Sequence, residues 1–360
     1  SKEGSITVLA SFGCIAGLQG HSCLDTLPSM KFFRIRRFLV LIALLASDPG
    51  IGEEFPVIRR SFASPTAPVP PFTNGVFDPH SGETISFLGG TDVFDLDRDP
   101  FFETMVHLAW PDRILHFRNL AWQGDSIYYQ ARPRFFYTQI GDPQPGSIPD
   151  HRERTSAGII CIGFGKMESL EAGNSLEKFT AAYTSILDDL SALTGRLVLF
   201  APTPFYTIGP ASDLAKERNE RLETYVQAIE SLAKKRGLLF VDLFHLLLRE
   251  NDPACSSDGV HLSALGQNRA AQLIATELKF PKATVKDATA ADSLREAIRR
   301  KNRLWQQYYR PTNWAFLFGD RQHVPASRDV ENRDGRWFVR EIDSLPGLIA
   351  ETEADIHRYA

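Results

Sequence analysis

Five short apolar runs, interleaved with segments of helical periodicity, are the feature that most limits what this chain can fold into. The runs lie at residues 84–88, 114–120, 158–162, 197–200 and 238–243. Apolar positions at helical spacing predict helices at residues 101–110, 176–193, 212–236 and 263–278. Strands that are nearly all apolar and alternate with helices are typical of a parallel sheet covered on both faces. The sequence therefore predicts an α/β domain over residues 83–280.

Ligands of open parallel sheets bind beyond the carboxyl ends of the strands, so the loops there hold the candidate site residues. In a turn before the last of these helices, Asp258 precedes His261 by three residues. The Asp258 carboxylate can orient the His261 ring and stabilise the imidazolium, which leaves the other ring nitrogen free to take a proton from a hydroxyl. The alternative is a helix cap, in which Ser263 begins the helix and Asp258 only solvates the turn.

Taken in order, the loops resemble the sequence blocks of the SGNH or GDSL-type hydrolases, a flavodoxin-like family of esterases and acylhydrolases. They are Gly89-Gly90-Thr91-Asp92, residues 119–126, Gly163-Phe164-Gly165-Lys166-Met167-Glu168 and Asp258-Gly259-Val260-His261. The last block fits the family best. The resemblance covers residues 83–280 and implies a three-layer α/β/α fold, ester hydrolysis, a nucleophile in the first loop and oxyanion donors in the second and third.

The first block departs from the family pattern. Gly89-Gly90-Thr91 stands where the family has Gly-Asp-Ser, so the resemblance places Thr91 at the nucleophile. A threonine hydroxyl can attack a carbonyl when a base lies beside it, although its extra methyl group restricts χ1 and crowds the tetrahedral adduct. We therefore expect slower turnover than a serine would give. In the alternative interpretation, the Gly-Gly-Thr turn only caps the following helix.

The oxyanion donors depart as well. Met167 occupies the place of the family's Asn, and a thioether donates no hydrogen bond. Loss of one such donor typically lowers turnover about a hundredfold to a thousandfold, unless Lys166, Gln123 or a backbone amide substitutes. The backbone amides expected to serve are those of Gly90 or Thr91 and of Gly124.

A second hydroxyl competes with that of Thr91. Residues 124–126 read Gly-Asp-Ser, the nucleophile motif of the family, which makes Ser126 an alternative nucleophile. The motif follows the second predicted strand, however, and taking it as the first block would leave the strand and loop that end at Thr91 without a role. We therefore place Gly124 in the second block and favour Thr91.

The amino-terminal part has the pattern of an export signal. From Met30, a cationic segment precedes a short apolar run at residues 38–46, which small residues follow. This pattern predicts a signal peptide at residues 30–53, with residues 1–29 upstream of the true start. We expect a secreted or periplasmic protein with no stable membrane insertion after cleavage; a signal anchor is the alternative. The proline-rich residues 54–82 predict an extended lead-in.

The carboxyl-terminal residues 281–360 predict a helical and aromatic appendage, with helices near residues 293–308 and 344–359. Its aromatic side chains can stack on sugar rings, form a lid over the site, or pack the appendage onto the core, which is the interpretation we favour. They are Trp305, Tyr308, Trp314 and Phe316. The basic run at residues 299–301 predicts a solvated helix face.

Composition and cysteine placement limit the partners. A net charge of −4 and a pI near 6.2 give no overall field that attracts polyphosphate, so nucleic acid is not an expected partner. The spacing of Cys and His residues does not match a metal site, and no organic cofactor is implied. Cys161 lies in a predicted strand and Cys255 in a loop, and we expect two unpaired thiols.

Together these observations predict an exported ester hydrolase. Thr91, or alternatively Ser126, attacks the ester, His261 takes and returns the proton, and Asp258 orients His261. An O-acetyl group on a polysaccharide is the expected substrate. The alternative function is that of a catalytically impaired carbohydrate-binding module, which keeps the fold and the cleft but has lost turnover through Thr91 and Met167.

Overall fold

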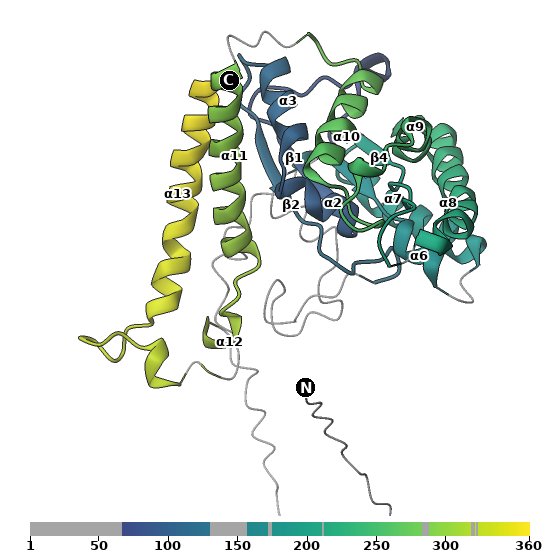
Figure 1. Cartoon of the computed structure of the whole chain (residues 1–360). Coiled ribbons are helices and arrows are strands. Elements are labelled where there is room, and N and C mark those ends of the chain that lie inside the picture. The colour runs from purple at the N-terminus through teal and green to yellow at the C-terminus, as the bar shows by residue number, and fades with distance from the viewer. Residues whose placement is uncertain are drawn as a thin grey trace, which may run out of the picture. The chain divides into compact units, whose positions relative to one another are not determined.

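The computed structural model describes residues 67–129, 157–171, 175–210, 212–282, 288–317, 321 and 323–360. Within them, five strands form one parallel sheet in the order β2-β1-β3-β4-β5 (Figure 1). They are β1 (Thr84–Gly89), β2 (His116–Asn119), β3 (Ala157–Gly163), β4 (Leu197–Phe200) and β5 (Leu239–Val241). β2 lies on one side of β1, and β3 and the later strands lie on the other. Such sheets bind their ligands at this switch in strand order, here between β1 and β3. The predicted parallel sheet is confirmed, whereas the predicted signal peptide lies outside the described residues.

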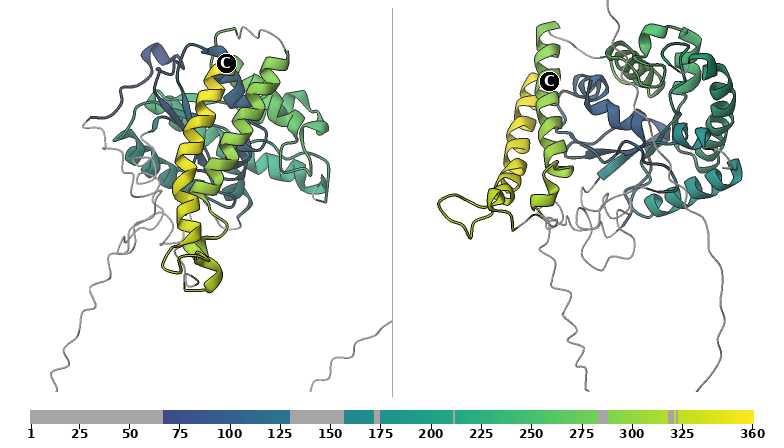
Figure 2. Two further views of the ribbon diagram at one scale, coloured as in Figure 1. Left: turned by 90° about the vertical axis from the view of Figure 1, so that its left-hand side faces the viewer. Right: turned by 60° about the horizontal axis from the view of Figure 1, so that its bottom comes forward.

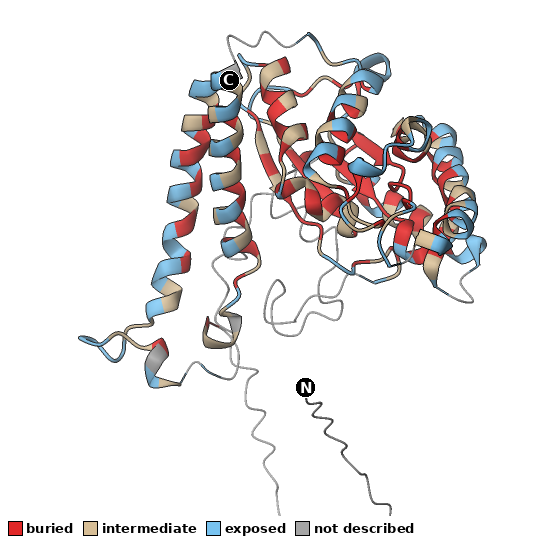
Figure 3. Cartoon of the chain, in the orientation of Figure 1, coloured by how far each residue is buried: buried red, intermediate tan, exposed pale blue. Residues whose placement is uncertain are grey.

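Strand side chains alternate between two apolar layers. Ile160 and Ile162 of β3 pack in one layer with α7 (Leu176–Ser191) and α8 (Ala215–Arg236). Ile159 and Cys161 point the other way, into a layer with α3 (Phe101–Ala109) and α10 (Ala264–Glu277). Figures 2 and 3 show the sheet between these helical layers, with its strands largely buried. Burial on both faces is why the strands are apolar at consecutive positions.

Three short helices begin in the loops at the carboxyl edge of the sheet. They are α2 (Thr91–Phe94), α6 (Lys166–Leu170) and α9 (Leu243–Glu250). The strand predicted to reach residue 243 ends at Val241, because the Asp242 side chain accepts the backbone N–H of His245 at 3.0 Å and caps α9. The predicted boundary was too late because Leu243 is apolar like the strand residues before it, although it is the first residue of α9.

The described part of the lead-in packs on the domain. Val69 forms an isolated parallel bridge with Thr194, and Phe72 and Phe77 are buried in the same apolar layer as α3. Residues 67–82 therefore contribute side chains to the core.

Two long helices of the appendage, α11 (Ala288–Tyr309) and α13 (Trp337–Tyr359), lie side by side next to β2 and α3 (Figures 1 and 2). Trp305 and Tyr308 of α11 are buried, and Trp305 Nε1 donates to the carbonyl oxygen of Asn119 at 2.9 Å. Packing onto the core is thus confirmed for these two side chains, which leaves them unable to stack on a sugar. The short helix α12 (Trp314–Leu317) places Phe316 against Phe338, with ring centroids 5.7 Å apart, and the side chain of Trp314 lies outside the described part.

The prediction of a solvated basic face at residues 299–301 was wrong for Lys301. Its side chain is 1% exposed, and its Nζ lies 2.8 Å from Glu103 Oε1. Arg300 is exposed as expected. One residue of this basic run, Lys301, therefore forms a buried ion pair that joins the appendage to α3.

Two simpler expectations concern the thiols and the membrane. Cys161 and Cys255 are both buried and unpaired, as predicted. In the described part of the chain, every helix is too short or too polar to cross a lipid bilayer.

Candidate functional site

The turn ahead of α10 fixes the ring of His261. Asp258 Oδ2 lies 2.6 Å from His261 Nδ1, while Asp258 Oδ1 accepts the backbone N–H groups of Val260 at 2.9 Å and of His261 at 2.8 Å. Burial alone would raise the pKa of Asp258, but the amide and ring of His261 and the amide of Val260 outweigh it and lower that pKa to about 2. An ionised Asp258 holds the Nδ1 proton, which leaves Nε2 as a proton acceptor. Ser263 caps α10 as well, accepting the Gly266 N–H at 3.2 Å, so the helix cap and the oriented His261 ring occur in the same turn.

A second Asp-x-x-His sequence in the chain differs from the first in the hydrogen bonding of the histidine ring. Asp242 Oδ2 lies 2.7 Å from His245 Nδ1, in the same local geometry. Here, however, Glu223 Oε1 lies 3.0 Å from His245 Nε2 and occupies it. Among the described residues, no hydrogen bond reaches His261 Nε2, and His261 lines a cavity. Of the two histidines, His261 has the unoccupied nitrogen that a general base requires.

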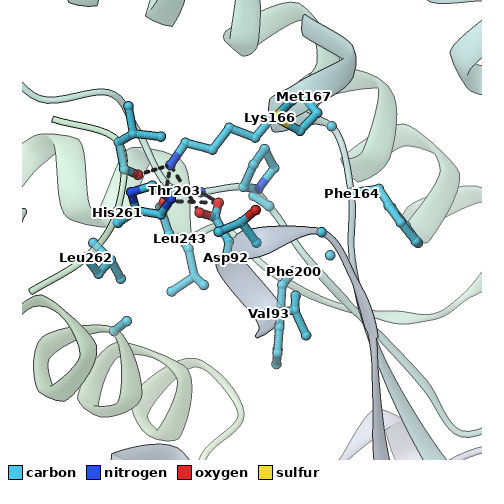
Figure 4. Close-up of a pocket in the computed structure, with 18 of the residues that line it drawn as sticks. Asp92, Val93, Phe164, Lys166, Met167, Phe200, Thr203, Leu243, His261 and Leu262 are labelled. Atoms are coloured by element: carbon cyan, nitrogen blue, oxygen red, sulfur yellow. Dashed lines mark hydrogen bonds and ion pairs between the residues drawn. The ribbon is translucent and has the colours of Figure 1, made fainter. Parts of the chain in front are cut away.

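A cavity of about 220 Å³ opens at the carboxyl ends of the strands (Figure 4). The loops after β1, β2, β3 and β4 and the His261 turn each contribute to its wall. Their side chains there include Thr91, Asp125, Met167, Thr203 and His261. The structure therefore brings Thr91 and His261 to one cavity although the sequence separates them widely.

Thr91 is the first residue of α2, and the two glycines before it let the chain pass close to β3. A Cβ atom on Gly89 would lie 2.2 Å from the carbonyl oxygen of Gly163, so a side chain does not fit there. Gly90 donates its amide to the same carbonyl at 3.1 Å and is thereby engaged. The Thr91 amide, at the first position of a helix, has no hydrogen bond among the described residues. Of the two amides expected to bind an oxyanion, that of Thr91 is the available one.

The other expected donors lie less favourably. Gly124 sits in an exposed turn with φ 81°, and its neighbour Asp125 lines the cavity in its place. Met167 lines the cavity and is 42% exposed, but its sulfur donates no hydrogen bond. Gln123 is exposed and is not among the lining residues.

The alternative nucleophile, Ser126, occupies a tight turn beyond β2. Its backbone N–H donates to the Tyr129 carbonyl at 3.1 Å, and the Tyr129 N–H donates back at 3.2 Å. Ser126 is not among the residues that line the cavity with His261. The structure thus places Thr91, and not Ser126, on the wall that the base shares.

Lys166 is fully engaged and does not replace the missing donor. Its Nζ donates to the Val260 carbonyl at 2.6 Å, to Thr203 Oγ1 at 2.7 Å and to Asp92 Oδ1 at 3.1 Å (Figure 4). An ammonium group has three protons, and all three are used here. Asp92 Oδ2 also accepts the amide and the hydroxyl of Thr203, at 2.9 and 3.0 Å. Lys166 therefore ties the Thr91 loop, the loop after β4 and the His261 turn into one unit.

Two further groups hold the loop after β2, and sequence reasoning missed both. Glu168 accepts the amide of Ile127 at 2.5 Å and that of Gly165 at 2.8 Å, and burial raises the pKa of Glu168. Arg310, from the end of α11, donates to the Asn119 carbonyl at 3.2 Å and to the Ala121 carbonyl. The site is therefore supported from the third loop and from the appendage.

Within residues 67–360, so far as the structure describes them, no group of three or more His, Cys, Asp or Glu side chains is arranged to hold a metal ion. What the arrangement can do is move a proton between a hydroxyl and an imidazole in an apolar, partly enclosed space. That is the chemistry of acyl transfer.

Comparisons with known proteins give one family match and several solved structures of low sequence identity. Residues 111–269 match the GDSL-like Lipase/Acylhydrolase family, a range that includes Ser126, Met167, Asp258 and His261 but begins after Thr91. No curated protein matches the chain. An acetylxylan esterase from Geobacillus stearothermophilus is 17% identical with a TM-score of 0.43, over 57% of this chain and 97% of its own. A putative GDSL-like lipase from Parabacteroides merdae is 15% identical with a TM-score of 0.44, over 56% and 98%. Residues 111–269 of this chain are therefore similar to a GDSL-like lipase/acylhydrolase domain, a class of ester hydrolases.

Proposed function

We propose that this chain hydrolyses carboxylic esters with Thr91 as the nucleophile and His261 as the general base. The observation that carries the proposal is the shared cavity: Thr91 and His261 line it together, and His261 Nε2 is unoccupied among the described residues. Asp258 supports the same assignment, because its carboxylate orients the ring and offsets the charge that the ring gains.

The reaction follows from these positions. His261 Nε2 takes the hydroxyl proton as Thr91 Oγ1 attacks the ester carbonyl, and the Thr91 amide donates to the oxyanion of the tetrahedral adduct. The C–O bond to the alcohol then breaks, and the alcohol leaves with the proton held on His261. A water molecule repeats the sequence on the acyl-threonine, with His261 again as base, and releases the carboxylic acid and the free hydroxyl.

Hydrolysis of p-nitrophenyl esters by the purified protein tests the assignment. Thr91→Ala and His261→Ala should each lower kcat by roughly a thousandfold or more, the scale on which loss of one member of such a group acts. Thr91→Ser should raise kcat, because the crowding methyl group is gone. His245→Ala is the matched control: it removes the same local motif and should leave kcat unchanged. A large loss in Ser126→Ala with none in Thr91→Ala would assign the nucleophile to Ser126 instead.

The identity of the acyl group is tested separately from the reaction. An O-acetyl group on a polysaccharide is the interpretation drawn from the sequence, and acetate release from an acetylated oligosaccharide measures it. A protein that binds the oligosaccharide but releases no acetate, and cleaves no other ester, would instead be the impaired binding module.

We further propose that the protein is exported, on the support of the cationic and apolar segments from Met30 to residue 46. Amino-terminal sequencing of the mature protein should find a start between residues 47 and 53. A mature protein that retains Met30 would contradict cleavage.

A further inference from the structure

The cavity that Thr91 and His261 line continues inward, between the carboxyl edge of the sheet and α10. Beyond His261 its wall is formed by apolar side chains that are all buried (Figure 4). They are Val93, Phe200, Leu243, Leu262, Ala270 and Ile274. We call this part the inner chamber. It is continuous with the site because one cavity includes both sets of residues.

The size of the cavity exceeds what an acetyl group needs. Acetyl adds one methyl group to the carbonyl carbon, whereas the cavity measures about 220 Å³. An apolar cavity of about 150 Å³ is large enough to hold a benzene molecule, that is, six carbon atoms. An acetyl ester would therefore leave most of this space unfilled, and contacts with the buried wall would be lost.

Small residues on α10 make the space. Gly266 lies so close to the preceding turn that a Cβ atom there would be 1.9 Å from the Cys255 carbonyl oxygen, which draws the start of the helix toward that turn. One turn later, Ala270 presents only a methyl group to the chamber. A leucine at this position would project into the space that the alanine leaves.

One polar atom interrupts the otherwise apolar wall. Gln267 is 2% exposed and lines the cavity, and its Oε1 has no hydrogen-bond partner among the described residues. Buried amide oxygens are satisfied in nearly all proteins, by water or by a ligand group. Since the hydrocarbon chain of an ester has no hydrogen-bond donor, a water molecule in the cavity is the partner that fits this oxygen.

Resting on the ester hydrolysis proposed above, we propose that the inner chamber receives the acyl chain, and that the preferred substrate is an ester of a linear acid of roughly six to eight carbons. The carbonyl carbon lies at Thr91, the chain passes His261 into the chamber, and the alcohol remains on the solvent side. Apolar contact along the chain then supplies binding that a shorter acyl group lacks.

A series of p-nitrophenyl esters from acetate to dodecanoate tests this directly. For the unmodified protein, kcat/KM should rise at least tenfold from acetate to hexanoate or octanoate and fall again at dodecanoate. Ala270→Leu should lower the octanoate-to-acetate ratio of kcat/KM at least tenfold. Ala275→Leu, on the same helix but outside the cavity wall, should leave that ratio unchanged. A profile that is highest at acetate, or an Ala270→Leu ratio equal to that of the unmodified protein, would overturn the proposal.

Binding separates failure of this proposal from failure of the proposed function. Octanoate should bind the unmodified protein and Thr91→Ala at least tenfold more tightly than acetate does, as measured by calorimetry, and Ala270→Leu should abolish the difference. Octanoate binding without hydrolysis of any ester would keep the chamber and reject the reaction. Hydrolysis restricted to acetate, with no octanoate binding, would keep the reaction and reject the chamber.

Discussion

Two histidines of this chain are each held by an aspartate three residues earlier, and they differ in the other ring nitrogen. Glu223 occupies Nε2 of His245, whereas the described residues leave Nε2 of His261 without a hydrogen bond. The Asp258–His261 pair could be predicted from sequence because its geometry is local to one turn. The same local pattern at Asp242 shows why the motif alone does not establish catalysis: the deciding carboxylate comes from a different helix.

The Lys166 network was the part of the site that sequence could not supply. Thr203 and Asp92 lie 111 residues apart, and their contact depends on which loops meet at the edge of the sheet. The sequence indicated only that Lys166 and Asp92 lie in loops expected at the same edge of the sheet. Sequence therefore suggested Lys166 as a possible oxyanion donor, while the structure engages all three of its protons elsewhere.

We predict that Lys166→Met lowers kcat about a hundredfold with a smaller change in KM, because a small displacement of the His261 turn has an effect of that order. The free energy of unfolding should fall by roughly 3 kcal/mol, since Asp92 loses its counter-ion in a mostly buried place. Steady-state kinetics and urea unfolding measure the two effects. In the double variant Lys166→Met with Asp92→Asn, stability should recover and kcat should not. Wild-type kcat in the single variant would show that Lys166 does not position His261.

At the scale of elements, the strands were predictable because β1, β3 and β4 are largely buried and mostly apolar. In β2 the pattern is weaker, since polar residues alternate with Phe117 and the strand is only partly buried. The ends of the strands were harder to predict. At β5 the apolar pattern continues to residue 243, but Asp242 caps α9 and the strand ends at Val241. The inner chamber could not be predicted at all. It depends on how closely α10 approaches the sheet and on which loops meet beside it, and periodicity gives neither.

Helix α13 adds His357 to a group with His107 of α3 and His116 of β2. The ring centroid of His357 lies 5.6 Å from the ring centroid of His107 and 6.2 Å from that of His116. Glu353 bonds both His116, at 3.0 Å, and Arg118, at 2.6 Å. Burial, and then the neighbouring His107 and His116, lower the pKa of His357. This group lies where α13 meets the domain, so its protonation affects that contact.

We predict that acidification weakens the fold through His357. The folded chain holds the proton of His357 more weakly than the unfolded chain does, so the unfolded chain is protonated first as the pH falls below about 6.5. The free energy of unfolding therefore declines below that pH until the lowered folded-state pKa is reached. Urea unfolding from about pH 7.5 to about pH 5 should show a smaller decline in His357→Gln than in the unmodified protein.

His245→Gln serves as the matched comparison for this measurement. Burial lowers the pKa of His245, but hydrogen bonds to Glu223 and Asp242 outweigh burial and raise it. His245 thus contributes stability that is present below about pH 6.5 and lost as the pH rises through its raised pKa. Its removal should steepen the acid decline. Equal pH profiles in the unmodified protein and His357→Gln would contradict the role of His357.

At the scale of the whole molecule, the appendage is part of the domain. Lys301 of α11 is buried against Glu103 of α3, and the two residues lie 198 positions apart in the chain. Burial would raise the pKa of Glu103, but Lys301 and His107 outweigh it and lower that pKa. A run of three basic residues gave no sign in sequence that one of them turns inward, because the partner belongs to a distant helix.

We predict that Lys301→Met lowers the free energy of unfolding by roughly 3–5 kcal/mol, since it removes the ammonium group that neutralises the buried Glu103 carboxylate. Replacing both residues, as Lys301→Met with Glu103→Met, should restore stability to within about 1 kcal/mol of the unmodified protein. Chemical denaturation of the three variants, with Glu103→Met alone as the third, completes the cycle. A cost below about 1 kcal/mol for Lys301→Met would mean that water reaches the pair in solution.

Trp305 and Arg310 both donate to the carbonyl of Asn119, the last residue of β2, and so hold the appendage against the loop that follows this strand. The family match begins at residue 111 and stops at residue 269, so a graft cut at those borders discards both Thr91 and the two side chains that brace the neighbouring loop. Borders drawn from the family match alone would separate Thr91 from His261. A chimera that keeps both side chains and the parts that support them must include the chain from residue 67 through α13.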